Sequence, residues 1–156
     1  MLTLTLPYPI SANAYWSSRI VTPRGGKPFV AVYVTHEARK YKEQVAWLAK
    51  AAGVRAPIAG RVAINVRLYP HRPQDWQARQ RKLGEAWDDS VQCLDLDNAN
   101  KVLLDAIKEV VIEDDRWVRQ IYSERMEPDA QGARVVLVVR PLCTEPRQTA
   151  LILDAA

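Results

Sequence analysis

The chain has 156 residues, of which 48% are hydrophobic and 26% are charged, and its formal net charge is +4. This length fits one domain with its own core, and the composition excludes a globally disordered chain. The positive balance is compatible with a nucleic-acid partner but does not establish one by itself.

Two cysteines, Cys93 and Cys143, are too few for a disulfide framework and form no CxxC zinc motif. One disulfide between them stays open, although two reduced structural thiols fit better. No apolar stretch approaches the roughly 18 residues that a membrane span needs, and the N-terminus lacks the pattern of a signal peptide. We therefore expect a soluble, cytoplasmic protein with no membrane partner.

The N-terminal third of the sequence predicts a strand, a hairpin and a helix. Leucine and threonine alternate over residues 2–6, which is the period of a half-buried strand. Residues 11–18 are typical of a loop. Residues 20–34 favour a hairpin, with Gly25-Gly26 at its tip. Apolar residues at spacings of three and four then predict a helix over residues 36–52.

The middle of the sequence contains the clearest strand and the least regular segment. Residues 61–69 alternate between apolar and polar side chains. Residues 71–92 show no sustained apolar periodicity and predict a long basic loop, in which residues 75–83 can form a short helix. An apolar face over residues 98–110 predicts the second main helix.

The last third predicts a turn and two strands. Residues 113–116 are typical of a turn, and residues 118–126 and 133–139 favour strands joined by the turn-rich sequence PDAQG. The pattern after Pro141 predicts no element, although residues 150–153 are apolar and could dock or pair with a partner chain.

These elements follow the order strand, hairpin, helix, strand, helix, strand, strand. We therefore expect an α+β fold in which a small mixed β-sheet carries two main helices on one face. Residues 1–141 are expected to form a single domain with a long basic loop at 71–92, and residues 142–156 a C-terminal tail.

An acidic cluster lies where the second helix is expected to begin. Asp95 and Asp97 flank one leucine, and in an extended lead-in residues two apart point to the same side. Lys101 and Asp105 follow at intervals of four residues, so they share a helical face with Asp97. Carboxylates are the ligands that Mg²⁺ prefers, and a lysine beside them can hold a phosphate oxygen.

A simpler interpretation of the same residues is structural. An aspartate at a helix start is most often a cap, and Asp97, Lys101 and Asp105 could form an ordinary ladder of surface salt bridges. Spacing alone favours this interpretation. However, Asp114 and Asp115 follow in the turn after the same helix, in a chain that is otherwise basic. Carboxylates that lie close together repel one another unless a cation compensates, which favours a metal site.

Three motifs in this order resemble the RusA family of Holliday-junction resolvases. Residues 95–101 (DLDNANK) and 104–106 (LDA) resemble that family's D-L-D-N-x-x-K-x-x-x-D-A-L segment. Residues 112–118 (IEDDRWV) resemble its L-x-D-D-x-x-V turn. Residues 4–9 (LTLPYP) and 11–13 (SAN) resemble its opening strand, Pro-x-Pro and Ser-x-Asn. One such motif would be weak, but the ordered trio is specific.

The resemblance implies a RusA-like nuclease domain in a homodimer that cuts four-way DNA junctions by paired nicks, in DNA recombination and repair. It implies Mg²⁺ as cofactor, or Mn²⁺ in its place. Asp95, Asp97 and Asp115 would be metal-binding catalytic acids, and Lys101 would contact the scissile phosphate. Whether Asp114 contributes stays open.

The sequence also departs from the family pattern. Leu94 stands where better-known members carry arginine, the segment 71–92 is longer, and residues 142–156 extend past the resemblance. These departures leave the branched substrate open. A nuclease for forks or flaps is therefore an alternative, as is a junction-binding protein that does not cut. The bacterial, prophage or phage origin is not decided by the residues.

Several residues outside the acidic cluster could contact DNA, and each could equally be solvated surface. Asn13 could instead shape its own loop. Trp76 and Trp87 could stack on unpaired bases, although packing within their segment is favoured. His36 and His71 fit surface or capping roles better than catalysis. The candidate DNA contacts are Asn13, Arg24, Lys27, Arg72, Arg79, Arg81 and Lys82.

Overall fold

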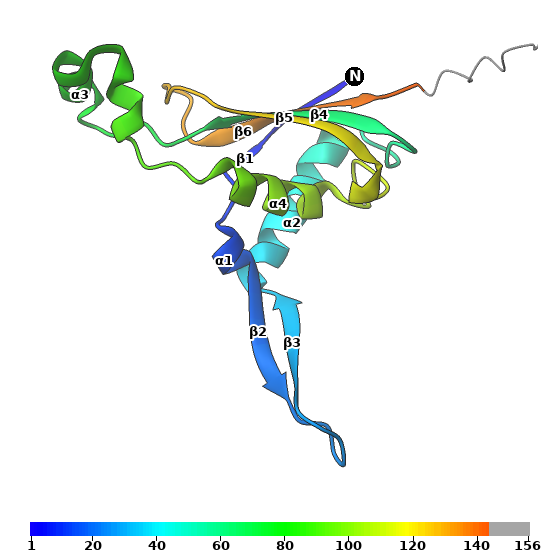
Figure 1. Cartoon of the computed structure of the whole chain (residues 1–156). Helices are drawn as coiled ribbons and strands as arrows, with labels where there is room; N and C mark the ends of the chain where they lie inside the picture. The colour runs from blue at the N-terminus through cyan, green and yellow to red at the C-terminus, as the bar shows by residue number, and fades with distance from the viewer. Residues whose placement is uncertain (144–156) are drawn as a thin grey trace, which may run out of the picture.

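A computed structural model describes residues 1–143 of the chain. Its centre is a four-stranded sheet in the order β1-β6-β4-β5 (Figure 1). The parallel pair is β4 with β5, and β6 runs antiparallel to both β1 and β4, so the sheet is mixed. Its strands are β1 (Leu2–Pro7), β4 (Val62–Tyr69), β5 (Val118–Arg125) and β6 (Arg134–Pro141).

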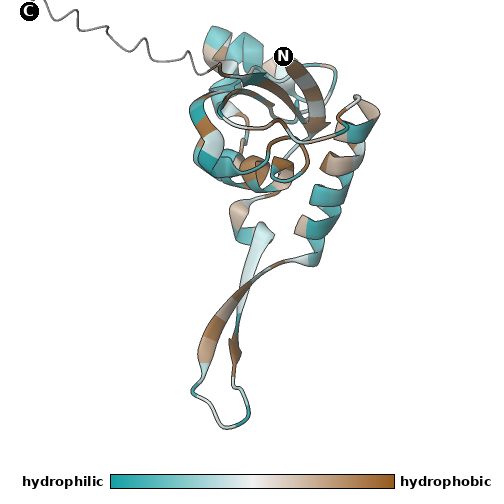
Figure 2. Cartoon of the chain, turned by 90° about the vertical axis from the view of Figure 1, so that its right-hand side faces the viewer, coloured by the Kyte–Doolittle hydropathy of each residue, from teal (hydrophilic) through white to brown (hydrophobic). Residues whose placement is uncertain are grey.

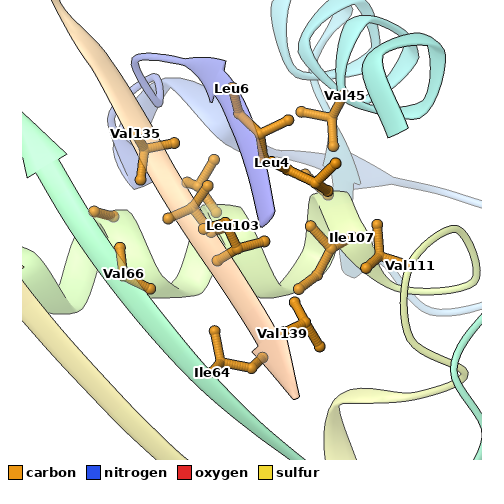
Figure 3. Close-up of a cluster of buried hydrophobic side chains, with 14 of the residues drawn as sticks. Leu4, Leu6, Val45, Ile64, Val66, Leu103, Ile107, Val111, Val135 and Val139 are labelled. Atoms are coloured by element: carbon orange, nitrogen blue, oxygen red, sulfur yellow. The ribbon is translucent and has the colours of Figure 1, made fainter. Parts of the chain in front are cut away.

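The two main helices, α2 (His36–Ala51) and α4 (Leu96–Ile107), both lie on one face of this sheet (Figure 1). Alternate residues of β1, β4 and β6 point at them and are fully buried, as the period-two patterns predict (Figure 3). Leu103 and Ile107 of α4 pack into the same cluster. The expected α+β class, with two main helices on one face of a mixed sheet, is therefore confirmed.

The N-terminal part of the chain contains more structure than the sequence predicts. Residues 11–18 include a one-turn helix, α1 (Ala12–Tyr15), and the start of β2, so the expectation of a loop there is wrong. The Ser11 side chain accepts a hydrogen bond from the Asn13 amide, and the Tyr15 ring is buried in the core. Burial of this one ring fixes the turn, which local pattern alone does not indicate.

The expected hairpin is present and stands away from the body of the protein. β2 (Trp16–Val21) pairs antiparallel with β3 (Phe29–Val34) in a separate two-stranded sheet. The pair projects from the helices as a long arm, and apolar segments appear on both strands (Figures 1 and 2). At its base the Thr35 amide donates to the Tyr15 carbonyl at 3.0 Å, which fastens the arm to α1.

The segment 71–92 is largely helical rather than an open loop. It forms α3 (Trp76–Leu83), close to the short helix expected, and then the 3-10 helix η1 (Gly84–Ser90). Trp87 is buried and its indole N–H donates to Glu127 at 2.8 Å. The Arg125 guanidinium also donates to the carbonyls of Asp88 and Val91. We call residues 76–90 the insert.

The remaining expectations concern segment ends, cysteines and membranes. A second 3-10 helix, η2 (Asp115–Trp117), replaces the expected turn before β5. Cys93 and Cys143 are both free thiols. Within residues 1–143 no helix is both long and apolar enough to cross a membrane. The predicted tail lies outside the described residues from 144 onwards, including its apolar stretch at 150–153.

Candidate active site

The segment that leads into α4 is held by Tyr8, a partly buried tyrosine that directly follows β1. The Leu94 amide donates to the Tyr8 hydroxyl at 2.8 Å, and that hydroxyl donates to the Cys93 sulfur at 3.4 Å. Burial is the main cause that raises the pKa of Tyr8 to about 12, so its hydroxyl stays protonated at neutral pH. The backbone next to Asp95 is thereby fixed in an extended form.

Asp95 occupies the N-cap position of α4 without acting as a side-chain cap. Its carbonyl accepts from the Ala99 amide at 2.9 Å, but its carboxylate makes no capping hydrogen bond within the described residues. The capping interpretation of the sequence therefore does not account for the Asp95 carboxylate. This carboxylate is left at an exposed helix start, where the helix dipole also favours negative charge.

Asp97 and Lys101 form the salt bridge that their spacing predicts. The Lys101 ammonium lies 3.5 Å from an Asp97 oxygen, with 62% and 71% of the two side chains exposed. An exposed pair of this kind contributes little to stability, at most about 1 kcal/mol. Both groups are therefore free to exchange this contact for another ion or for phosphate at small cost.

Asp105 does not continue this ladder but serves the packing of the arm. It accepts a short hydrogen bond from the buried Tyr15 hydroxyl and lies 3.1 Å from the Lys42 ammonium. Burial, more than the neighbouring carboxylate, raises the pKa of Tyr15. Asp105 thus joins α1 and α2 to α4, a role that its spacing from Lys101 did not indicate.

Asp114 and Asp115 lie beyond the other end of α4. The Lys108 ammonium is 3.3 Å from Asp114 and 3.4 Å from Asp115. Asp114 also accepts from the Arg116 amide, the main cause that lowers its pKa. At about 1.5 Å per residue, Asp97 and Lys108 are roughly 16 Å apart along the helix axis. Asp115 therefore does not share a site with Asp97 within one chain.

The side chains of one chain also form no larger metal-binding cluster within residues 1–143. Over that range no three side chains of Asp, Glu, His or Cys come together as a metal-binding group. Asp95 and Asp97 offer exposed carboxylate oxygens of the kind that Mg²⁺ binds together with water and substrate phosphate. The chemistry of the donors at the start of α4 thus fits Mg²⁺ as a two-carboxylate site.

The candidate DNA contacts fall into two groups. Asn13, Arg24 and Lys27 belong to the arm and its base, and all three are exposed. The others belong to the insert and its lead-in. There Arg72 stacks on the Trp76 ring at 4.7 Å. Arg79 is bound to Asp75, and Arg81 and Lys82 are exposed in the last turn of α3. Trp76 packs against Trp87, as the packing interpretation predicts.

A cavity that the sequence did not reveal lies beside the lead-in to α4. Its volume is about 690 Å³, and its walls come from residues 8–11 after β1, residues 71–79, residues 90–94 and Ala133 before β6. His71 lines this cavity, whereas His36 is the first residue of α2. Such a cavity is assembled from four separate segments, so no local pattern could indicate it.

Comparison with known proteins identifies the family. The family model described as Endodeoxyribonuclease RusA matches residues 7–140, which is most of the chain. No curated protein matches the chain. The match runs from the last residue of β1 into β6 and includes the acidic start of α4, the insert and the Asp114-Asp115 pair. The protein therefore belongs to the RusA family of endodeoxyribonucleases.

Proposed function

We propose that this protein is a Mg²⁺-dependent endonuclease that resolves four-way DNA junctions by paired nicks, in DNA recombination and repair in the cytoplasm. The main observation behind this proposal is that the Asp95 carboxylate makes no capping hydrogen bond within residues 1–143. It is therefore available for a metal ion, beside the exposed side chains of Asp97 and Lys101. Membership of an endodeoxyribonuclease family and a net charge of +4 support the same proposal. Residues 1–141 would form the nuclease domain.

Each residue at the start of α4 has a distinct role in this proposal. Asp95 and Asp97 would hold the metal, and Mn²⁺ could replace Mg²⁺ because it also accepts oxygen ligands. When bound, the metal supplies an activated water and neutralises charge on the phosphate. Lys101 would leave Asp97 and contact a non-bridging oxygen of the scissile phosphate. Tyr8 would keep Asp95 in position through the Leu94 amide.

The exposed face of the arm supports a homodimer. Ile20, Val30 and Val32 lie on one face of the hairpin and are 74%, 65% and 68% exposed. A two-stranded hairpin is marginal on its own, and contiguous exposed apolar side chains mark interaction surfaces. A second copy of the chain is the partner that a roughly two-fold junction requires, because two nicks need two sites. The opposite face carries Arg19 over Tyr33.

A dimer would also explain the place of Asp115. Because α4 separates it from Asp97 in one chain, we propose that Asp115 completes the metal site of the other subunit. Asp114 is bound by the Arg116 amide and is the less available of the two acids. The basic side chains at the tip of the arm and in the insert would then bind the phosphates of the DNA duplexes that leave the junction. Arg79 is less available for this, because it is paired with Asp75.

The activity itself is tested by nicking of branched DNA. Wild type with Mg²⁺ is expected to place symmetric nicks in a mobile four-way junction, and Asp97→Asn to lose at least about 100-fold in rate because a ligand is removed. The measurement is strand-specific cleavage on denaturing gels, with EDTA as the metal-free control. A fork, a flap and a plain duplex are the comparison substrates. Faster cutting of forks or flaps would favour the alternative substrate class, and junction binding without nicks would favour a non-catalytic protein.

The positioning role of Tyr8 can be separated from its packing. Tyr8→Phe keeps the ring but removes the hydroxyl that holds the Leu94 amide. We expect about tenfold weaker Mg²⁺ activation, because groups that orient a metal ligand have effects of this size. The melting temperature should fall only slightly, since one hydrogen bond is lost and the ring stays in place. Titration of nicking rate against Mg²⁺ concentration measures it. Tyr122→Phe, whose side chain is 61% exposed on β5, is the matched control. Equal Mg²⁺ curves for the wild type and Tyr8→Phe would refute the role.

The dimer surface can be tested by charge. The double variant Val30→Lys, Val32→Lys places two ammonium groups on the proposed interface. It is expected to sediment as a monomer at concentrations where the wild type is a dimer, because buried unpaired charges are costly. Trp47→Lys on α2 is the control, since Trp47 is also 68% exposed but lies outside the arm. A double variant that remains dimeric would place the interface elsewhere.

The shared site can be tested by mixed dimers. Chains carrying Asp97→Asn and Asp115→Asn are co-expressed with different tags and the heterodimer is isolated. If each site takes Asp97 from one subunit and Asp115 from the other, the heterodimer contains one intact site and regains nicking of one strand. Each homodimer should be inactive. A heterodimer as inactive as both homodimers, or an active Asp115→Asn homodimer, would rule out the shared arrangement.

A further inference from the structure

The cavity beside the lead-in to α4 has a position that ties it to the proposed active site. Leu94 forms part of its wall, and Leu94 is followed directly by Asp95. Consecutive Cα atoms are about 3.8 Å apart, so one edge of the cavity lies a single residue from the first carboxylate. A DNA strand whose phosphate sits at Asp95 and Asp97 would therefore have a neighbouring nucleotide at the mouth of this cavity.

The charged residues that line the cavity indicate whether it suits the phosphate or the base of a nucleotide. Among the described residues that line it, Arg79 is the only arginine or lysine. Its guanidinium already donates to Asp75 at 2.9 and 3.0 Å and to the Ser90 carbonyl at 2.9 Å. Although the protein has a net charge of +4, the described residues that line the cavity thus include no arginine or lysine that is free to bind a phosphate. A neutral group is the better occupant.

The walls have the chemistry that a flat, neutral, partly polar group needs. Tyr8 and His71 contribute rings, and Pro9 and Leu94 contribute apolar surface. The Gln92 side chain on the rim carries both amide donors and an acceptor. Aromatic and apolar side chains stack on nucleobases, and amide groups read their polar edges. A volume of about 690 Å³ is also of the order that small-molecule sites have.

We propose that this cavity binds one unpaired nucleobase of the strand that is nicked, next to the scissile phosphate. The inference rests on the proposed nuclease function and adds a determinant of substrate choice to it. A base inside a duplex must be unpaired and unstacked before it can enter, whereas a base at a branch point is already partly released. The cavity would therefore favour branched DNA over plain duplex even where the phosphate contacts are the same.

The experiment fills the cavity without touching the acids. Ala133→Phe adds a ring from the turn before β6, where Ala133 lines the cavity. Ala130→Phe in the same turn is the matched control, because Ala130 is exposed and lies outside the lining. Melting temperatures and circular dichroism establish that both variants fold. Four-way junctions carry 2-aminopurine in turn at each nucleotide of the crossover, and a further set carries an abasic residue at the same places.

Two readouts are taken with the wild type and both variants. Fluorescence in EDTA reports release of the analogue base from its stack on binding, and nicking in Mg²⁺ reports activity. We expect one position to brighten with the wild type and Ala130→Phe but not with Ala133→Phe. We also expect Ala133→Phe, or an abasic residue at that position, to slow nicking about tenfold or more, as loss of a stacked base predicts.

Other results overturn the proposal or separate it from the nuclease function. If no position brightens with the wild type, or if Ala133→Phe brightens and nicks like the wild type, the cavity does not bind a base. An abasic junction cut at the normal rate would show that no base in the cavity is needed for nicking, which also overturns the proposal. Brightening that depends on Ala133 without any nicking would support the cavity while refuting the nuclease function.

Discussion

Burial of α4 against the sheet is the constraint from which the arrangement of the candidate site follows. The helix is apolar on one side, where Val102, Leu103, Ala106 and Ile107 are excluded from solvent. Once that side is packed, the opposite side of the helix has to face solvent. Asp97 and Lys101 are exposed for this reason, and Asp95 follows them because its backbone begins the helix.

Much of this arrangement follows from the sequence because it rests on local periodicity. Three strands of the sheet (β1, β4 and β6) and both main helices have the periods that buried elements show, and the Asp97–Lys101 pair follows from helical spacing. The separation of Asp115 from Asp97 was also within reach, since a helix of 12 residues is about 18 Å long. A motif gives the order of these acids along the chain but not the distance between them.

The features that sequence reasoning missed depend on contacts between distant segments. The turn at Ala12–Tyr15 is stabilised by a ring that enters the core and by Asp105, 90 residues away from Tyr15. The insert is held by the hydrogen bond that the Trp87 indole N–H donates to Glu127, 40 residues away in the sequence. Neither segment shows a periodic apolar pattern, because α3 has no buried residue and α1 is a single turn. Tertiary contacts decide such segments, and no single window of sequence contains both partners.

The Tyr15–Asp105–Lys42 network has a mechanical consequence for a dimer built on the arm. It joins the base of the arm to α4 one turn after Lys101, so we expect the base of the arm and the helix of the proposed site to move together. The distance between two active sites would then be set when the subunits associate and would change little on binding DNA. A junction whose strands are spaced differently would have to adjust the angle between its own arms, and the bending energy of the DNA would become part of the selectivity.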